Sequence, residues 1–187
     1  MKKYFLIYLI LLVTTIQLYC QGFCATPNSS HNSSLNNNMR GTTSLSGMVN
    51  LRIYVHSIRK SNGSGGQLIM NIQSGINIMK NDFANHNITF DWDGIINFID
   101  NDSYYLNPDT YIYNVDNHCD GIDIYIFDEN AVSTGRANGV GESSEFFISG
   151  NLVNTSVMSH EMGHVLFLWH THHGTFLNKE ILINVLS

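Results

Sequence analysis

One short segment constrains the fold of this chain more than any other. Residues 160–170 contain the pattern H-E-x-x-H, with a third histidine six positions after the second. Residues four apart share a helical face, so His160 and His164 direct their imidazoles to one point if this segment is helical. His170 lies too far along to share that face, and it reaches the other two only if the helix ends soon after His164. The pattern therefore predicts a helix followed at once by a turn.

The residue types in this segment are those of a metal site. Zn²⁺ is bound by neutral imidazole nitrogens, and a catalytic zinc keeps three protein ligands and one open position for water. Glu161, which follows a ligand directly, is placed to take a proton from such a water as general base. The sequence thus predicts that His160, His164 and His170 bind Zn²⁺ and that Glu161 is the catalytic residue of a zinc hydrolase.

Residues 157–164 followed by 168–171 resemble the active-site segment of the pappalysin/cytophagalysin family, a group of secreted metzincin zinc endopeptidases. Members commonly run H-E-x-G-H-x-x-G-L-x-H-T, and this chain matches every fixed position but one. Residues 51–58 and 121–127 resemble two strands of that family. The resemblance implies an α+β fold: a metzincin-like catalytic domain with a mixed twisted sheet, a backing helix and an active-site helix. It also implies hydrolysis of a peptide bond in a protein or peptide substrate.

The chain departs from the family pattern at two places. Phe167 stands where metzincins have the glycine that permits an abrupt turn, and a positive φ is unfavourable for so bulky a residue. We therefore expect either a turn of another form or a displaced His170, with His172 or His173 as substitute ligands. Metzincins also carry a methionine turn after the third histidine. Only 17 residues follow His170 here and none is methionine, so we expect the C-terminal subdomain to be largely missing.

The N-terminal segment is typical of a secretory signal. Lys2 and Lys3 precede an apolar stretch at 4–18, which is short for a membrane span. We expect residues 1–22 to be a signal peptide, with cleavage within about 20–25, and the protein to be secreted. A lipoprotein or an uncleaved membrane anchor is the minority alternative, and we expect no stable membrane insertion after signal removal.

After such cleavage Cys24 and Cys119 can remain. A disulfide between them is allowed in an exported protein, as are free thiols. His118, next to Cys119, is interpreted as a loop residue because adjacent residues of an extended chain point to opposite faces.

Residues 23–47 are rich in serine and asparagine, which predicts a disordered linker or propeptide remnant. Residues 48–187 are expected to form the zinc peptidase domain, incomplete at its end. Alternating apolar residues predict strands at 51–55, at 87–99 (one or two), at 121–127 and at 146–148. Residues 104–115 are expected to be a long loop with a short extended piece. Spacings of three and four predict an amphipathic helix with these residues on its buried face: Ile69, Ile72, Ile76, Met79 and Phe83.

Residues 135–141 are rich in glycine. A phosphate-binding loop needs a helix after it, and no helix signal follows Gly141. By the resemblance, this stretch is an edge strand that pairs with extended substrate, a mode of binding that accepts many peptide sequences.

Composition narrows the classes of partner. The net charge is −6 and the lysines and arginines are scattered, so we expect no nucleic-acid binding. Oligomeric state is not determined by the sequence.

Three other interpretations remain open. A third ligand from a downstream glutamate would have to be Glu180. A truncated, non-catalytic remnant of a protease could still bind zinc. Finally, the chain could be a secreted binding module whose histidines are incidental.

Overall fold

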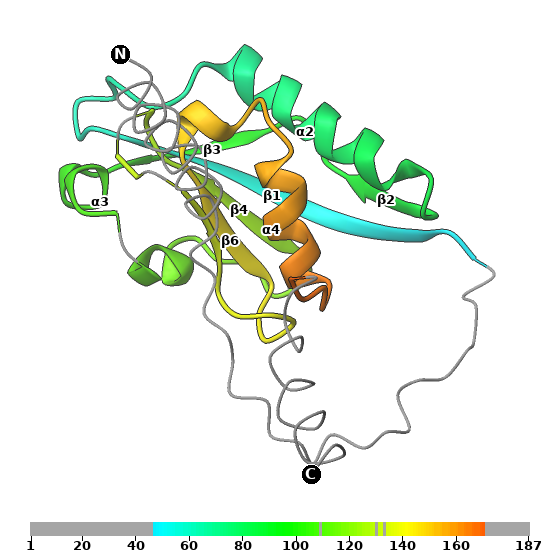
Figure 1. Ribbon diagram of the computed structural model, residues 1–187. Coiled ribbons are helices and arrows are strands. Elements are labelled where there is room, and N and C mark those ends of the chain that lie inside the picture. The colour runs from blue at the N-terminus through cyan, green and yellow to red at the C-terminus, as the bar shows by residue number, and fades with distance from the viewer. Residues whose placement is uncertain (1–46, 109, 130, 133, 171–187) are drawn as a thin grey trace, which may run out of the picture.

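The computed structural model of the chain describes residues 47–108, 110–129, 131–132 and 134–170. They form a mixed α/β fold in which a mostly parallel sheet carries its two longer helices on one face (Figure 1). The expected signal peptide and, up to residue 46, the expected linker lie outside the described residues. Residues 171–187 of the expected domain also lie outside them.

The sheet has six strands in the order β2-β1-β4-β6-β5, and β3 also pairs with β1. The strands are β1 (Val49–Arg59), β2 (Ile88–Asp91), β3 (Ile96–Asp100), β4 (Ile122–Ile126), β5 (Gly135–Ala137) and β6 (Glu145–Ile148). Each pairing is parallel except the antiparallel pairing of β5 with β6. The early part of β1 pairs with β2 and its later part with β3, so one long strand supports two short ones. β5 lies at the end of this order and is an edge strand.

Three α-helices occur in the described part of the chain: α2 (Ile69–Ala84), α3 (Asp102–Leu106) and α4 (Val157–Val165). Two 3₁₀ turns, η3 (Thr110–Asn114) and η4 (Gly150–Leu152), accompany them. Parallel strands need a crossover connection, and α2 supplies it between β1 and β2. None of these helices has both the length and the apolar character required to span a membrane.

The two faces of the sheet have separate cores, because successive side chains of a strand point to opposite faces. The first core lies beneath α2 and α4 and contains Ile53, Val55, Ile72, Ile76, Met79, Ile124, Phe146, Met158 and Met162, among others. The second core lies on the opposite face and contains Ile58, Ile99, Ile112, Tyr113, Tyr125, Phe127 and Phe147. All five residues of β4 are buried, since this strand is covered on both faces.

The predicted strands and the predicted amphipathic helix are confirmed, and the segment 87–99 contains two strands. The helix buries four of its five predicted apolar residues. Ile69 is the exception and is 50% exposed, because it begins the helix.

The prediction of a long loop with an extended piece at 104–115 is wrong. The segment contains the end of α3 and all of η3. The side chain of Asn101 accepts hydrogen bonds from the backbone N–H groups of Ser103 and Tyr104 and so caps α3. Tyr113 and Ile112 of η3 are buried in the second core, which favours a compact conformation over an extended one.

Candidate metal centre

The helix α4 places two of the predicted ligands. Its buried side, which includes Met158 and Met162, packs in the first core and fixes the helix against the sheet. His160 and His164 lie one turn apart, with His160 exposed and His164 only 2% exposed. The α-helix begins after Ser156, and the hydroxyl of Thr155 accepts the N–H of Val157 in its first turn. The helix ends at Val165, directly after the second ligand, as the spacing of the histidines predicts.

The turn that follows α4 is made by Phe167 in a left-handed conformation, with φ 68°. Its N–H donates to the carbonyl of His164 at 3.1 Å, and the N–H of Leu168 donates to that of Gly163 at 2.8 Å. These two bonds are those of a Schellman motif, which terminates a helix through one left-handed residue. The expected alternatives, another form of turn or a displaced His170, are both wrong: the turn forms with phenylalanine in the place of glycine.

A second residue, Gly141, makes this turn possible. A β-carbon at Gly141 would lie 2.2 Å from the ring of Phe167, so the ring occupies the space that a side chain there would need. The N–H of Gly141 also donates to the carbonyl of His164 at 2.8 Å. The loop between β5 and β6 therefore holds both the end of α4 and the unusual turn residue. Nothing in the local sequence pattern at 135–141 indicated this contact.

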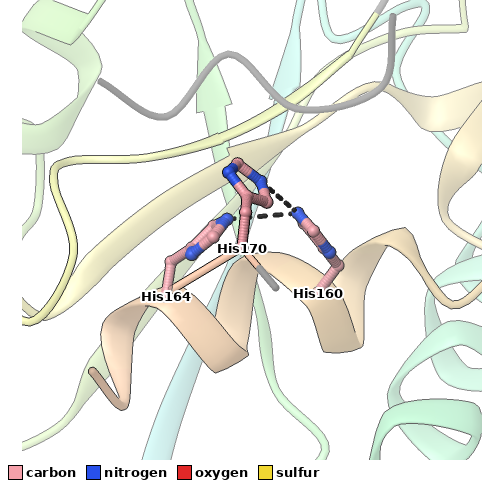
Figure 2. Close-up of side chains that lie close together, drawn as sticks. All are labelled: His160, His164 and His170. Carbon is pink, nitrogen blue, oxygen red and sulfur yellow. Dashed lines mark hydrogen bonds between the residues drawn. The ribbon is translucent and has the colours of Figure 1, made fainter. Parts of the chain in front are cut away.

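The turn brings His170 to the other two histidines, and the three rings point toward one another (Figure 2). The Nε2 atom of His160 lies 3.1 Å from that of His164 and 3.2 Å from that of His170. Two nitrogens bound tetrahedrally to one Zn²⁺ at its usual bond length are about 3.3–3.4 Å apart. The three nitrogens thus have the spacing of ligands to a single ion, and the group could hold a metal ion.

The protonation of His164 is fixed by a backbone carbonyl. Its Nδ1 lies 2.7 Å from the carbonyl oxygen of Leu168, which can only accept, so Nδ1 carries the proton. In the neutral ring Nε2 is then left with its lone pair, directed at the other two histidines. Metal-bound histidines are oriented by such a bond on the opposite nitrogen. The turn residue Leu168 therefore prepares His164 for a metal ion.

A cavity of about 340 Å³ adjoins the three histidines. Its wall includes Ser159, Gly163, Leu168 and Trp169 besides the ligands. Glu161 is not among the residues that line it. The three-histidine group is therefore open to molecules through this cavity.

Glu161 is fully buried between α4 and the edge strand β5. Its Oε2 accepts the N–H of Ala137 at 3.0 Å. A β-carbon at Gly135 would lie 2.7 Å from Cγ of Glu161, so this strand leaves room for the carboxylate only because residue 135 is glycine.

The N–H of Ala137 points to the side of β5 that faces away from β6, where it donates to Glu161. Asn138 donates its N–H to Glu145 of β6, and Thr134 accepts from Ser149. Because hydrogen bonding alternates along an antiparallel pair, the backbone N–H and C=O of Ala137 point away from β6. Glu161 therefore lies at the outer edge of the sheet and covers the side of β5 that the glycine-rich segment was expected to offer to an extended substrate, since Gly135 and Ala137 are both buried.

Other predicted features lie outside the described residues, namely the substitute ligands His172 and His173, the alternative ligand Glu180, and Cys24. Cys119 is exposed and has a free thiol in the described part of the chain.

Comparisons with models of known protein families, with curated proteins and with solved structures give no match. The function is therefore inferred from the residues of this chain.

Proposed function

We propose that the chain is a secreted zinc-dependent endopeptidase of the metzincin type, similar to the pappalysin/cytophagalysin family. The observation that carries the proposal is the convergence of three Nε2 atoms, with the lone pair of His164 directed inward by the carbonyl of Leu168. A set of three imidazoles suits Zn²⁺ and leaves an open position on the ion. In that position zinc lowers the pKa of water and polarises a carbonyl group.

The residues that would hold the ion are His160, His164 and His170. The first two are fixed by α4, and the third is fixed by the turn at Phe167. In this proposal Glu161 takes a proton from the attacking water and delivers it to the leaving amine. This role requires the buried carboxylate of Glu161 to leave Ala137 and turn into the cavity at the three histidines.

The edge strand β5 supports a peptide as the substrate. Gly135 and Ala137 direct backbone groups to the side of β5 away from β6, where Glu161 now covers them. An extended peptide can add there as a further strand once Glu161 has moved aside. Glu161 already contacts this side through the N–H of Ala137. A peptide paired with β5 would therefore run close to the proposed general base. Export through the N-terminal signal and the absence of nucleic acid among the partners belong to the same proposal.

The test is hydrolysis of a fluorescently labelled unfolded protein by the full chain with Zn²⁺. Glu161→Gln keeps the shape of the side chain and an acceptor for Ala137 but removes the base. We expect the rate to fall by at least about 10²-fold while bound zinc is retained, because loss of a general base typically costs 10²–10⁴-fold. His164→Ala should remove both the activity and the zinc ion held by the three histidines of this group.

The matched control is Glu129→Gln, a substitution of an exposed glutamate, which should leave the rate unchanged. Undiminished hydrolysis by Glu161→Gln would sink the mechanism.

One observation favours a second candidate, a domain that binds zinc without hydrolysis. Glu161 is held by Ala137 and does not line the cavity at the three histidines. Stoichiometric zinc binding by the wild-type chain, with no cleavage of any unfolded protein, would support this candidate over the peptidase.

A further inference from the structure

A second group of metal-binding side chains lies on the opposite face of the sheet from α4. His56 is on β1 and Asp123 is on the neighbouring strand β4, while His118 is in the loop that precedes β4. In the register of the two strands, Tyr54 pairs with Asp123 and His56 pairs with Tyr125. Tyr125 belongs to the second core, so this group is separated from the three histidines of α4 by the sheet itself.

Asp123 is the centre of the group. Its Oδ1 lies 2.8 Å from Nε2 of His56 and 2.8 Å from Nδ1 of His118. Its Oδ2 accepts the backbone N–H of His118 at 2.9 Å. The side chains of His56 and Asp123 are completely buried, whereas that of His118 is 37% exposed.

The rings are also held by stacking. The ring of His118 lies parallel to that of Tyr54, with centroids 3.5 Å apart, and His56 stacks on Tyr125 at 4.6 Å. The phenol of Tyr54 is in turn fixed by a hydrogen bond to Asp120. All the proposed ligand atoms are therefore held in place before any ion binds.

A cavity of about 550 Å³ gives access to the group. His56 and His118 line it, together with Asn97 and the carboxylates of Asp93 and Asp116. Two carboxylates in the wall favour a cation over an anion. Asp123 itself does not line the cavity, whereas the partly exposed His118, which contacts Asp123, does.

We propose that His56, His118 and Asp123 form a second binding site for a divalent transition-metal ion of the Zn²⁺ type. Their ligand atoms lie within 4.8 Å of one another, and two imidazoles with one carboxylate are a ligand set for such ions. The cavity would leave at least one further position on the ion for water or a small ligand. This site does not depend on the proposed peptidase activity.

Binding changes the tautomers of both rings. In the hydrogen-bonded group, Asp123 can only accept, so His56 carries its proton on Nε2 and His118 on Nδ1. An ion takes the place of these protons, which move to Nδ1 of His56 and to Nε2 of His118. The second of these nitrogens adjoins the cavity, where water can accept its proton.

Asn97 is the positioning residue for His56. Its Nδ2 lies 3.1 Å from Nδ1 of His56 and 2.9 Å from a carboxylate oxygen of Asp116. When the ion binds, Asn97 turns its amide so that Oδ1 accepts the proton on Nδ1. Because Nδ2 also donates to Asp116, this turn leaves the exposed carboxylate of Asp116 to move aside and accept from water instead.

The test is the number of metal ions bound by the full chain. The protein is stripped with a chelator and titrated with Zn²⁺ by calorimetry and with Co²⁺ by visible absorption. We expect two ions for the wild-type chain and one for His118→Ala, for Asp123→Asn and for His164→Ala. The double variant His118→Ala/His164→Ala should bind none. His86→Ala, a substitution of an exposed histidine outside both groups, is the matched control and should bind two.

The outcomes separate this site from the first. A single ion that is lost only in His164→Ala overturns the second site and leaves the proposed function standing. A single ion that is lost only in the His118 and Asp123 variants supports the second site and overturns the proposed zinc peptidase. A second ion that survives both of those variants also overturns the proposal, because it must bind elsewhere.

Asn97→Leu provides a further check. It keeps the three ligands but removes the acceptor for His56, and loss of such a partner typically weakens metal binding by roughly 10–100-fold. The second ion alone should show this loss. An unchanged affinity would show that the ion is not bound through Nε2 of His56.

Discussion

The two groups of histidines lie on opposite faces of one sheet and are held together in opposite ways. In the group at α4 and the turn after it, Nε2 of His160 lies 3.1 Å from that of His164 and 3.2 Å from that of His170, and the group contains no carboxylate. In the group around Asp123, one buried carboxylate accepts hydrogen bonds from both rings at 2.8 Å. The first group is positioned by backbone, through a helix and a turn, and the second by its own side-chain hydrogen bonds.

We therefore expect the group around Asp123 to stabilise the fold, and the group of His160, His164 and His170 to contribute little to stability. Buried polar groups are costly unless they are paired, so the bonds to Asp123 are part of what stabilises β1 against β4. In the other group, His160 is exposed and His170 is partly exposed beside a cavity, so we expect the fold to depend less on these two rings. Three variants test this contrast, with effects that should decrease in the order given.

The largest effect is expected for Asp123→Leu. It leaves the buried Nε2–H of His56 without an acceptor, at about 1–3 kcal/mol, and the two partly buried donors of His118 each add a smaller loss. We expect the free energy of unfolding, measured with urea in the presence of a chelator, to fall by roughly 3 kcal/mol or more. If Asp123→Leu lowers the free energy of unfolding by less than His160→Ala does, the group around Asp123 does not stabilise the metal-free fold.

Gly141→Ala should have an intermediate effect that extends to the proposed metal site at His160, His164 and His170. Its φ of 65° costs a side-chain-bearing residue about 1–2 kcal/mol, and the new β-carbon displaces the ring of Phe167. We expect His170 to move with that ring and the affinity for one Zn²⁺ to fall by roughly 10–100-fold, as when an orienting partner is removed.

The double variant Gly141→Ala/Phe167→Gly removes the ring that clashes. It should recover the zinc affinity and lose only the backbone cost at position 141. If the double variant binds zinc no better than Gly141→Ala, the contact between the two residues is not what positions His170.

The smallest effect on stability is expected for His160→Ala. His160 is exposed, and substitutions at such positions usually change the free energy of unfolding by less than about 0.5 kcal/mol. The same variant should lose zinc at the first centre. A large loss of stability in chelator would mean that the group on α4 is as structural as the one around Asp123.

The parts of this molecule that depend on local patterns could be predicted from the sequence. The spacing of Ile72, Ile76 and Met79 is sufficient for α2, and the spacing of the histidines is sufficient for α4 and for its early end. The short helix α3 also had a local signal, the capping residue Asn101, which the apolar pattern around it concealed.

The turn at Phe167 could not be predicted, because local propensity argued against it. The contact that permits it comes from Gly141, on a different segment of the chain. The group around Asp123 was missed for a related reason: His56 and Asp123 are 67 residues apart and meet only through the register of β1 and β4. The sequence signal for this group was weak: His56 and Asp123 are polar residues at strand positions where a buried strand usually has apolar ones.

The contact between Phe167 and Gly141 also has a consequence for sequence variation. A ring at 167 forbids a side chain at 141, whereas glycine at 167 would remove that restriction. The two positions are therefore expected to vary together in descendants of this chain, with asparagine at 141, which tolerates a left-handed backbone, appearing only after 167 has become small. Selection would act on the pair as though it were a single residue.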